Sequence, residues 1–468
     1  MTVPSFFQAS WWALPVLVGL SLALYWPDLD LTAFSDDHSA VWNSGVRDIP
    51  WRNGMFRPIG DLTFRIGHLI SGTSSTGHRV FNVCLHAVNA FALFMLLLRI
   101  LSRGDRPFFG AFLGATLFLV YPFHQESIIW LVGRESALGT FFVLIGLLAL
   151  SSGRSARYRI ITTSLALLIG LLCYEGALVL PLLALVLSTF NAGSKRTPFS
   201  SLLMGYGTAV LLYLLALRMN GGAIMGSYAA GLFFEGLSDF FSNAPKVWMR
   251  LFLPPEPDPG AMLLKAGVIL TMITLVALLF RRSVQTDPVV GRTTLTLLWL
   301  LIVAGLFPMI VGVSARTSES DRFLYLPSAF LCALVASLMA RIPRTAFRLG
   351  LSVLVSMLFL GYLQLELGQW RTASAITARI LEELPEPPAR GTLFVTGLPD
   401  SYKGAYIFRN GFREAVAIHG GPAERYIDLK GDPPFADPVR YRGDDHRITR
   451  YDRWVRWNGR SFDGMDPR

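Results

Sequence analysis

Charged residues are scarce in this chain. They make up 16% of its 468 residues, whereas an ordinary soluble domain carries about 25%. A chain with so little charge cannot cover itself with a water-facing surface. Hydrophobic residues make up 52%, and the mean hydropathy is +0.46. The composition excludes a soluble enzyme, a disordered chain, collagen and a coiled coil, and it predicts a mainly α-helical, polytopic membrane protein.

Cysteine is also rare. The three cysteines, Cys84, Cys173 and Cys332, all lie inside apolar runs. They show neither the paired spacing of exported disulfide frameworks nor the clustered spacing of zinc ligands. We therefore expect neither a disulfide framework nor a zinc site.

Long apolar runs recur through the first 370 residues. Because a helix needs roughly 20 apolar residues to cross a bilayer, about eleven spans would use near half of the chain. The first run has no Lys or Arg before Trp11 and no small-residue cleavage pattern after it, so we expect it to remain as an anchor. The candidate spans lie near residues 6 to 26, 80 to 101, 108 to 123, 128 to 152, 160 to 173, 176 to 190, 201 to 219, 261 to 280, 293 to 311, 328 to 340 and 349 to 367.

Arginines in alternate short loops predict the sidedness. Short basic loops such as the one with Arg154, Arg157 and Arg159 belong in the cytoplasm by the positive-inside rule. The net charge of +10 is thus expected to set topology rather than to bind nucleic acid. The loop from 27 to 79 disagrees, but it is long and rich in aspartate, so we discount it. The N-terminus is predicted to be cytoplasmic, and with an odd number of spans the C-terminal part lies outside.

The C-terminal part differs from the rest of the chain. Residues 1 to 370 form the predicted transmembrane domain, and residues 371 to 468 a small extracytoplasmic α/β module. Within that module we expect strands at 392 to 396 and 425 to 429 and a helix over 404 to 418.

Asp36 and Asp37 stand just past the first span. Ionisable groups near a membrane are costly, so they are functional hypotheses by default. The pair either caps a following helix in a solvated loop or supplies a general base at the membrane surface.

A short turn between two apolar spans carries His124, Glu126 and Arg134. These side chains either form a structural ion pair, Glu126 with Arg134, or belong to a site. Glu175 interrupts another apolar run, where it either caps a turn or faces a polar cavity.

Arg316, Asp321 and Arg322 precede another span on the same predicted side. The planar fork of arginine suits a phosphate, because it binds two oxygens at once. The alternative is an interface anchor beside an aromatic belt. The histidines show no metal-ligand spacing.

Five segments stand out in order along the chain: 55 to 64 (MFRPIGDLTF), 81 to 89 (FNVCLHAVN), 121 to 126 (YPFHQE) with Gly133 and Arg134, 174 to 181 (YEGALVLP) and 321 to 327 (DRFLYLP). In this order they resemble the GT-C glycosyltransferases, in particular the transmembrane and tetratricopeptide-repeat O-mannosyltransferases and their bacterial relatives. The resemblance covers about residues 10 to 340.

The resemblance implies a GT-C-like core and an enzyme that takes a sugar from a polyprenyl-phosphate donor on the non-cytoplasmic face of a bacterial inner membrane. By position, Asp36 and Asp37 match the acidic motif of the first outer loop, Glu126 matches the acid of the second, and Arg57 matches an Arg-Pro element. Two departures matter. The tail lacks tetratricopeptide repeats, which leaves a protein, glycan or lipid acceptor open, and Tyr174 replaces a frequent Lys.

We therefore predict an inverting transfer to an acceptor hydroxyl, with a base among the acidic residues. We favour Asp37 over Asp36, because His38 could orient it. The alternatives are a transporter or flippase of polyprenol-linked sugars and a non-catalytic member of a glycan-assembly complex; transporters usually place their charges near the bilayer midplane. A divalent metal could replace the arginines. The predicted catalytic residues are Asp36, Asp37 and Glu126, the phosphate ligands Arg57, His124, Arg134, Arg316 and Arg322, and the further site residues Glu175 and Asp321.

Overall fold

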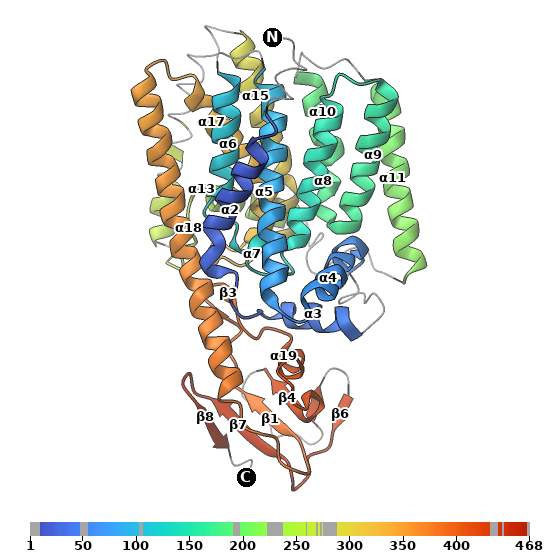
Figure 1. Cartoon of the computed structure of the whole chain (residues 1–468), viewed down its shortest axis with the longest axis vertical. Helices are drawn as coiled ribbons and strands as arrows, with labels where there is room; N and C mark the ends of the chain where they lie inside the picture. Colours follow the sequence, from blue (N-terminus) through green and yellow to red (C-terminus); the bar gives the residue numbers. More distant parts are fainter. Residues whose placement is uncertain are drawn as a thin grey trace.

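A bundle of helices carries a small β module at one end (Figure 1). The structure is a computed structural model. It describes residues 10–46, 55–102, 106–190, 197–221, 237–258, 260–267, 270–271, 274, 288–430, 439–441 and 444–465.

The bundle is that of an integral membrane protein. In the described part of the chain, six helical segments are long and apolar enough to cross a membrane. They are α5 (Ser75–Ile100), α9 (Ala156–Cys173), α11 (Phe199–Met219), Gly291–Val311, Asp321–Ala340 and α18 (Thr345–Glu382). Three shorter apolar segments accompany them, formed by α2 (Ala13–Tyr25), α6 (Pro107–Leu119) and α10 (Leu180–Phe190). The number eleven for the spans stays a prediction.

Two predicted spans are interrupted. The run from 128 to 152 divides into α7 (Gln125–Ile128) and α8 (Arg134–Leu150), and the run from 293 to 311 into α15 (Pro288–Ala304) and α16 (Leu306–Val311). Small residues explain how closely other helices approach. A Cβ on Gly114 of α6 would lie 3.5 Å from the Cβ of Ala336 on α17 (Tyr325–Ala340). Such small pairs let helix backbones pack without a hydrophobic driving force in lipid.

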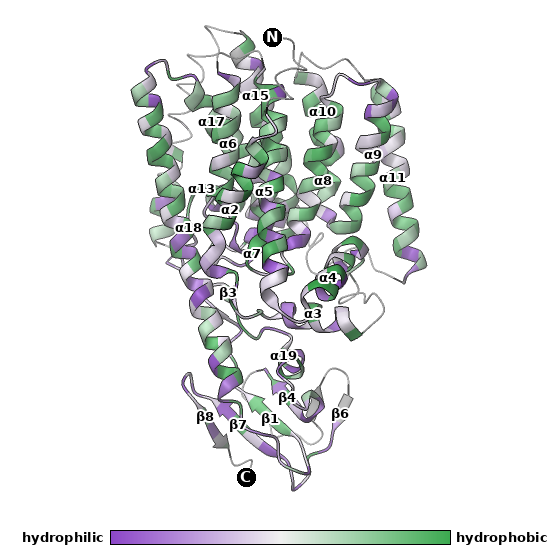
Figure 2. Cartoon of the chain, in the orientation of Figure 1, coloured by the Kyte–Doolittle hydropathy of each residue, from purple (hydrophilic) through white to green (hydrophobic). Residues whose placement is uncertain are grey.

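Short helices gather at the end of the bundle that faces the module. They are α3 (Asp36–Val46), α4 (Pro58–Ser71), α7, η3 (Glu175–Val179) and η5 (Asp321–Leu324). Pro58 begins α4, where its missing N–H costs nothing. Figure 2 shows apolar residues along the bundle and hydrophilic residues near both of its ends. Polar groups from distant parts of the sequence are therefore brought together at the module-facing end.

One long helix joins the bundle to the module. The 38 residues of α18 correspond to about 57 Å at 1.5 Å per residue, whereas the hydrocarbon core is only about 30 Å thick. The predicted boundary at residue 370 lies inside this helix, and Trp370 packs edge-on against Phe34 at 5.0 Å. The helix thus extends well past a membrane and carries the module with it (Figure 1).

The module contains a four-stranded sheet in the order β4-β1-β7-β8. The central strand β1 (Leu393–Thr396) pairs in parallel with β4 (Tyr426–Leu429) and β7 (Arg453–Trp457), and β8 (Phe462–Met465) pairs antiparallel with β7. A separate pair joins β5 (Val439–Tyr441) and β6 (Asp444–His446). Strands β7 and β8 were not predicted from the sequence.

The helix expected over 404 to 418 is wrong in its first half. Residues Ser401–Tyr402 (β2) and Ala405–Tyr406 (β3) form a tight hairpin, and the helix α19 spans only Phe412–Ile418. Lys403 and Gly404 have φ angles of 51° and 98°. Positive φ at both central residues is what a two-residue hairpin turn requires. The hairpin lies between the module and the bundle.

Candidate functional site

Arg57 is held by two carboxylates at the module-facing end of the bundle. Its Nη2 lies 2.7 Å from Glu175 Oε2, its Nε donates to both oxygens of Glu175, and its Nη1 pairs with Glu135. The Arg57 side chain is 18% exposed. Burial lowers the pKa of its guanidinium, but the charges of Glu175 and Glu135 outweigh burial and raise the pKa. Arg57 is therefore a fixed cation that orders two acids.

Arg322 is the second arginine, and it pairs with Glu126. Its guanidinium contacts Glu126 Oε1, and its main-chain N–H donates to Oε2 at 2.9 Å. The hydroxyl of Tyr406, from the β2–β3 hairpin, donates to the same Oε1 at 2.7 Å. Glu126 is 2% exposed, so this carboxylate is buried with every oxygen satisfied.

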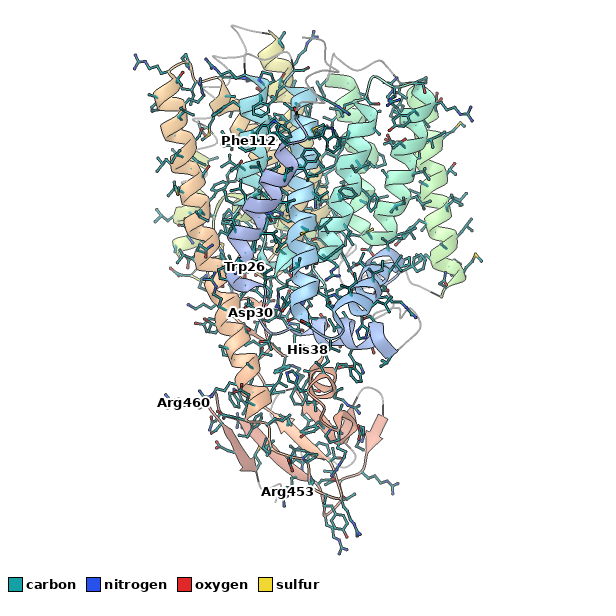
Figure 3. All side chains as sticks on the ribbon, viewed as in Figure 1. Trp26, Asp30, His38, Phe112, Arg453 and Arg460 are labelled. Carbon is teal, nitrogen blue, oxygen red and sulfur yellow. The ribbon has the colours of Figure 1, made fainter. Side chains whose placement is uncertain are left out.

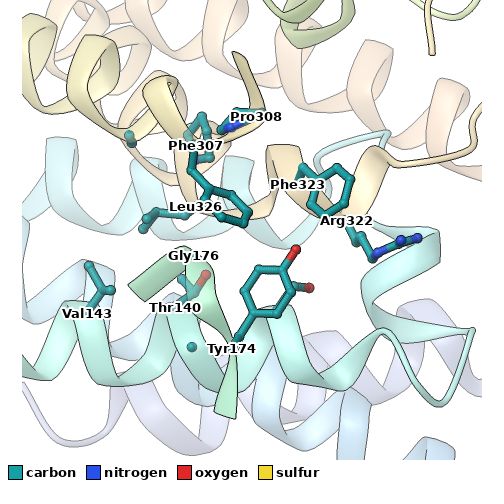
Figure 4. A pocket seen from close by; sticks show the side chains of 13 residues that line it. Thr140, Val143, Tyr174, Gly176, Phe307, Pro308, Arg322, Phe323 and Leu326 are labelled. Carbon is teal, nitrogen blue, oxygen red and sulfur yellow. The ribbon is translucent and has the colours of Figure 1, made fainter. Parts of the chain in front are cut away.

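A pocket opens beside Arg322. It is small and partly open to its surroundings, and it lies among α8, η3, α16, η5 and α17. Figure 4 shows Phe307, Leu326 and Phe323 facing Thr140 and Tyr174 across it, with Arg322 at one end. The other lining residues are Ser136, Gly139, Val143, Gly176, Ala304, Pro308 and Pro327. The lining is mostly apolar, and Arg322 lies at one end of it.

Tyr174 lies between the two arginines. The Arg57 guanidinium is 4.9 Å from the centre of its ring. Two glycines make room for this ring, because a Cβ on Gly139 or on Gly176 would lie 2.9 Å from Tyr174 atoms. Its buried hydroxyl has no hydrogen-bond partner among the described residues. At the wall of the pocket, the Tyr174 hydroxyl can therefore donate a hydrogen bond to a ligand.

Asp37 is buried and holds two main-chain segments together. Its side chain is 0% exposed, with Oδ1 accepting from Val132 N at 3.0 Å and Oδ2 from Phe34 N at 3.2 Å. Burial raises the pKa of the Asp37 carboxyl to about 7, although these main-chain donors favour its charged form. Asp37 thus ties the first loop to the loop before α8. Asp36 starts α3 and is half-buried.

The acidic motif and Glu126 lie around the same hairpin. Ser35 N donates to Ile407 O at 2.8 Å, and His38 stacks on Phe408 at 5.8 Å. Ile407 and Phe408 directly follow Tyr406, whose hydroxyl donates to Glu126. Figure 3 shows His38 at the junction of bundle and module. Asp36 is therefore next to Ser35, whose main chain bonds to Ile407, the residue after Tyr406.

Two predicted phosphate ligands lie in the protein interior. His124 is fully buried, with Nε2 2.7 Å from Ser328 Oγ, among aromatic rings. Arg134 is also fully buried; its guanidinium lies 4.0 Å from the centre of the Phe64 ring and donates to the carbonyl of His78. The alternative of a Glu126–Arg134 pair is wrong, because Glu126 pairs with Arg322. Neither side chain is placed to meet a ligand.

Asp321 and Arg316 also lie away from the pocket lining. Asp321 forms a buried pair with Arg250 at 2.5 and 2.7 Å, which accounts for it as a structural residue. Arg316 is exposed. Within the described part of the chain, no group of three or more His, Cys, Asp or Glu residues could hold a metal ion.

Three residues that form these ion pairs and hydrogen bonds were not predicted from the sequence. Glu135 directly follows the Gly133-Arg134 motif, so its position next to that motif was an available signal. Arg250, the partner of Asp321, lies on α13 (Leu237–Phe252), outside the segments that drew attention as candidate sites in the sequence. Nothing in the sequence marks Tyr406 as a partner of a residue 280 positions earlier.

Comparisons with known proteins agree with this architecture. No protein-family model matches the chain. Protein O-mannosyl-transferase TMTC3 of Homo sapiens is 25% identical over 230 residues, which are 40% of this chain and 24% of that protein. Protein O-mannosyl-transferase Tmtc1 of Drosophila melanogaster is 30% identical over 133 residues, which are 28% of this chain and 15% of that protein. The chain thus matches about a quarter or less of the length of these relatives.

A solved structure shares the fold. The crystal structure of ArnT from Cupriavidus metallidurans bound to undecaprenyl phosphate matches with a TM-score of 0.51 at 12% identity, over 90% of each chain. The resemblance to GT-C membrane glycosyltransferases related to the O-mannosyltransferases is thereby confirmed.

Proposed function

We propose that this protein is a membrane glycosyltransferase that moves a sugar from a polyprenyl-phosphate donor to an acceptor hydroxyl. The observation that carries the proposal is the apolar pocket with Arg322 at one end. A lipid-linked phosphate has matching chemistry, because its hydrocarbon chain favours apolar surroundings and its phosphate favours an arginine. Similarity to proteins named O-mannosyl-transferases and to ArnT bound to undecaprenyl phosphate supports the same assignment.

Arg322 is the phosphate ligand of this mechanism. Arg57 is held by two carboxylates, whereas Arg322 has a single carboxylate partner, Glu126. An incoming phosphate can take over the guanidinium of Arg322, because both anions bind it through the same planar fork. The main-chain N–H of Arg322 and the Tyr406 hydroxyl still hold Glu126 after that exchange.

A cluster of charged side chains suits the positive charge that develops on the sugar. It consists of Arg57, Arg322, Glu126, Glu135 and Glu175. Two arginines and three glutamates carry one excess negative charge. A sugar whose bond to phosphate breaks early becomes cationic at the anomeric carbon, and nearby carboxylates stabilise it. The acceptor oxygen forms the new bond at that carbon, and the electron pair of the broken bond leaves with the lipid phosphate.

Asp36 takes the role of general base, in place of the favoured Asp37. Asp37 is 0% exposed and both of its carboxylate oxygens accept main-chain N–H groups, so a substrate hydroxyl cannot reach it. Asp36 is half-buried at the start of α3. It removes the proton of the acceptor hydroxyl as that oxygen attacks the anomeric carbon opposite the departing phosphate, and this single displacement inverts the anomeric carbon.

The reaction takes place on the non-cytoplasmic face of a bacterial inner membrane. Basic loops at the opposite end of the bundle support this orientation, because by the positive-inside rule such loops favour the cytoplasm and leave the module-facing end outside. A Cys at Ser461 should react with an impermeant thiol reagent in intact cells; reaction only after lysis would overturn this orientation.

Transfer by purified protein tests the function. Wild-type protein in detergent with polyprenyl-phosphate sugars and a panel of hydroxyl acceptors should release polyprenyl phosphate and a glycosylated product. Arg322→Ala should lower kcat/KM by about 10²- to 10³-fold, as for other lost charge-stabilising donors. Arg379→Ala is the matched control, because Arg379 pairs only with Glu383 on the surface of α18.

The outcomes separate the alternatives. Equal activity of Arg322→Ala and wild type would refute the phosphate role. Movement of the lipid-linked sugar across proteoliposomes without product would favour a flippase, and absence of both activities would favour a non-catalytic partner.

A further inference from the structure

The C-terminal module reaches into the cluster through a single hairpin. The β2–β3 hairpin brings the Tyr406 hydroxyl to 2.7 Å from Glu126 Oε1 and 3.4 Å from Arg322 Nη1. Tyr406 is 4% exposed, and burial, with the nearby charge of Glu126, raises the pKa of its hydroxyl. The phenol therefore stays protonated and donates to the carboxylate.

The ring of Tyr406 is held on several sides. Trp130, from the loop before α8, packs on it at 4.9 Å, and Trp370 of α18 contacts it edge-on at 6.0 Å. The Arg409 guanidinium lies 4.9 Å from the centre of its ring, and Glu319 fixes that guanidinium at 2.7 Å. Such packing keeps the hydroxyl in one place.

The turn of the hairpin is seated equally closely on the bundle. A Cβ on Gly404 would lie 2.4 Å from Ser318 Oγ and 2.7 Å from Ser318 N. Ser318 Oγ donates to Lys403 O at 3.3 Å, and Ser401 Oγ donates to Glu319 Oε1 at 3.2 Å. Only a glycine allows this approach, so the hairpin and the segment before η5 fit as one surface.

We propose that the β2–β3 hairpin completes the site, with Tyr406 as a positioning residue that holds Glu126 while Arg322 binds the donor phosphate. This inference rests on the proposed function. When the guanidinium leaves Glu126 for the phosphate, the carboxylate loses one of its three donors. Tyr406 then supplies the side-chain hydrogen bond that keeps the Glu126 carboxylate beside Arg322 in η5.

Matched variants separate this role from general packing. Tyr406→Phe removes only the hydroxyl and keeps the ring. Its control is Tyr402→Phe on the partner strand, where the tyrosine does not bond to Glu126. Gly404→Ala should unseat the turn. Its control is Gly459→Ala, since Gly459 has a similar φ of 96° but no atom within 4 Å of an added Cβ.

Tyr406→Phe should lower kcat at least about tenfold with the donor KM within about threefold of wild type, because a misplaced catalytic group costs rate more than binding. Gly404→Ala should show the same loss, and both controls should keep wild-type kcat. Wild-type kcat in Tyr406→Phe, or an equal loss in both controls, would overturn the inference.

A stability measurement distinguishes failure of this inference from failure of the function. Tyr406→Phe, Glu126→Gln and the double variant are compared by thermal unfolding of the full chain. If the contact exists, the shift in Tm of the double variant is not the sum of the single shifts. Coupled shifts without any sugar transfer by wild-type protein would refute the proposed function and leave the contact in place. Additive shifts would refute the contact itself.

Discussion

Gly133 occupies a place where no larger residue fits. A Cβ added there would lie 1.7 Å from the carbonyl oxygen of Glu126 and 3.0 Å from Ser127 Cα. Its φ of −58° and ψ of −18° are ordinary for any residue, so the conflict is steric. Since contacts under 3.0 Å essentially do not occur, the backbone at Glu126 would have to move by 3.0 minus 1.7, or about 1.3 Å.

Gly133→Ala should therefore displace the acid from Arg322. Misplacing a catalytic group by about 1 Å can cost about 10²-fold in rate, and overpacking a close-packed region typically costs about 1 to 3 kcal/mol. We expect sugar transfer to fall about 100-fold and Tm to fall in the same preparation. The measurement is initial-rate transfer together with thermal unfolding in detergent.

Gly350→Ala is the control for this substitution. Gly350 lies in α18, and an added Cβ there would meet nothing within 4 Å, so the change should leave transfer intact and slightly raise Tm. A Gly133→Ala protein with wild-type rate and Tm would show that the loop accommodates the methyl group and would refute the steric argument.

Three further predictions follow from the same geometry. Asp36→Asn should lower transfer by about 10²- to 10⁴-fold, whereas Asp37→Asn should lower it less; the reverse order in a rate assay would restore Asp37 as the base. Because the pKa of Asp37 is raised from 3.8 to about 7, its stabilising contribution is fully present below pH 4 and is lost as pH rises through 7. The Tm of wild type relative to Asp37→Asn should thus be higher at pH 5 than at pH 8, and a constant difference would contradict the shift. Arg250→Met should destabilise by about 3 to 5 kcal/mol, because it leaves the buried charge of Asp321 unpaired; Arg250→Met with Asp321→Leu should recover much of the loss in denaturant unfolding.

The sequence predicts the helices better than their polar contacts. Apolar runs and charged interruptions are local signals, so Glu126 and Glu175 could be found as unusual acids between spans. The partner of Glu126 could not be found this way. Arg134 is only eight positions away, but its guanidinium lies on the Phe64 ring and bonds to carbonyl groups. The true partner, Arg322, lies 196 positions later.

The acidic pair shows why one pattern allowed two interpretations. A carboxylate at the start of a helix suits both a cap and a base. Asp37 accepts the N–H of Phe34 three residues earlier and also that of Val132. The second contact depends on how two distant loops pack, and no spacing within residues 34 to 38 encodes it. The same limit applies to the hairpin, where a helix-like run of residues yields to the turn at Gly404.

Under the proposed mechanism, charge balance links the C-terminal module to the bundle. Three glutamates around two arginines leave one excess negative charge, which suits a sugar cation but repels a phosphate. Arg57 cannot reduce that repulsion, because two carboxylates already hold it. Arg322 can do so only by leaving Glu126, and a buried carboxylate without a partner is costly. In the proposed mechanism the Tyr406 hydroxyl keeps its hydrogen bond to Glu126 both before and after the exchange, so it changes donor affinity little. It fixes the position of that carboxylate once the donor is bound, and turnover therefore depends on a residue that lies outside the bundle, on a hairpin of the C-terminal module.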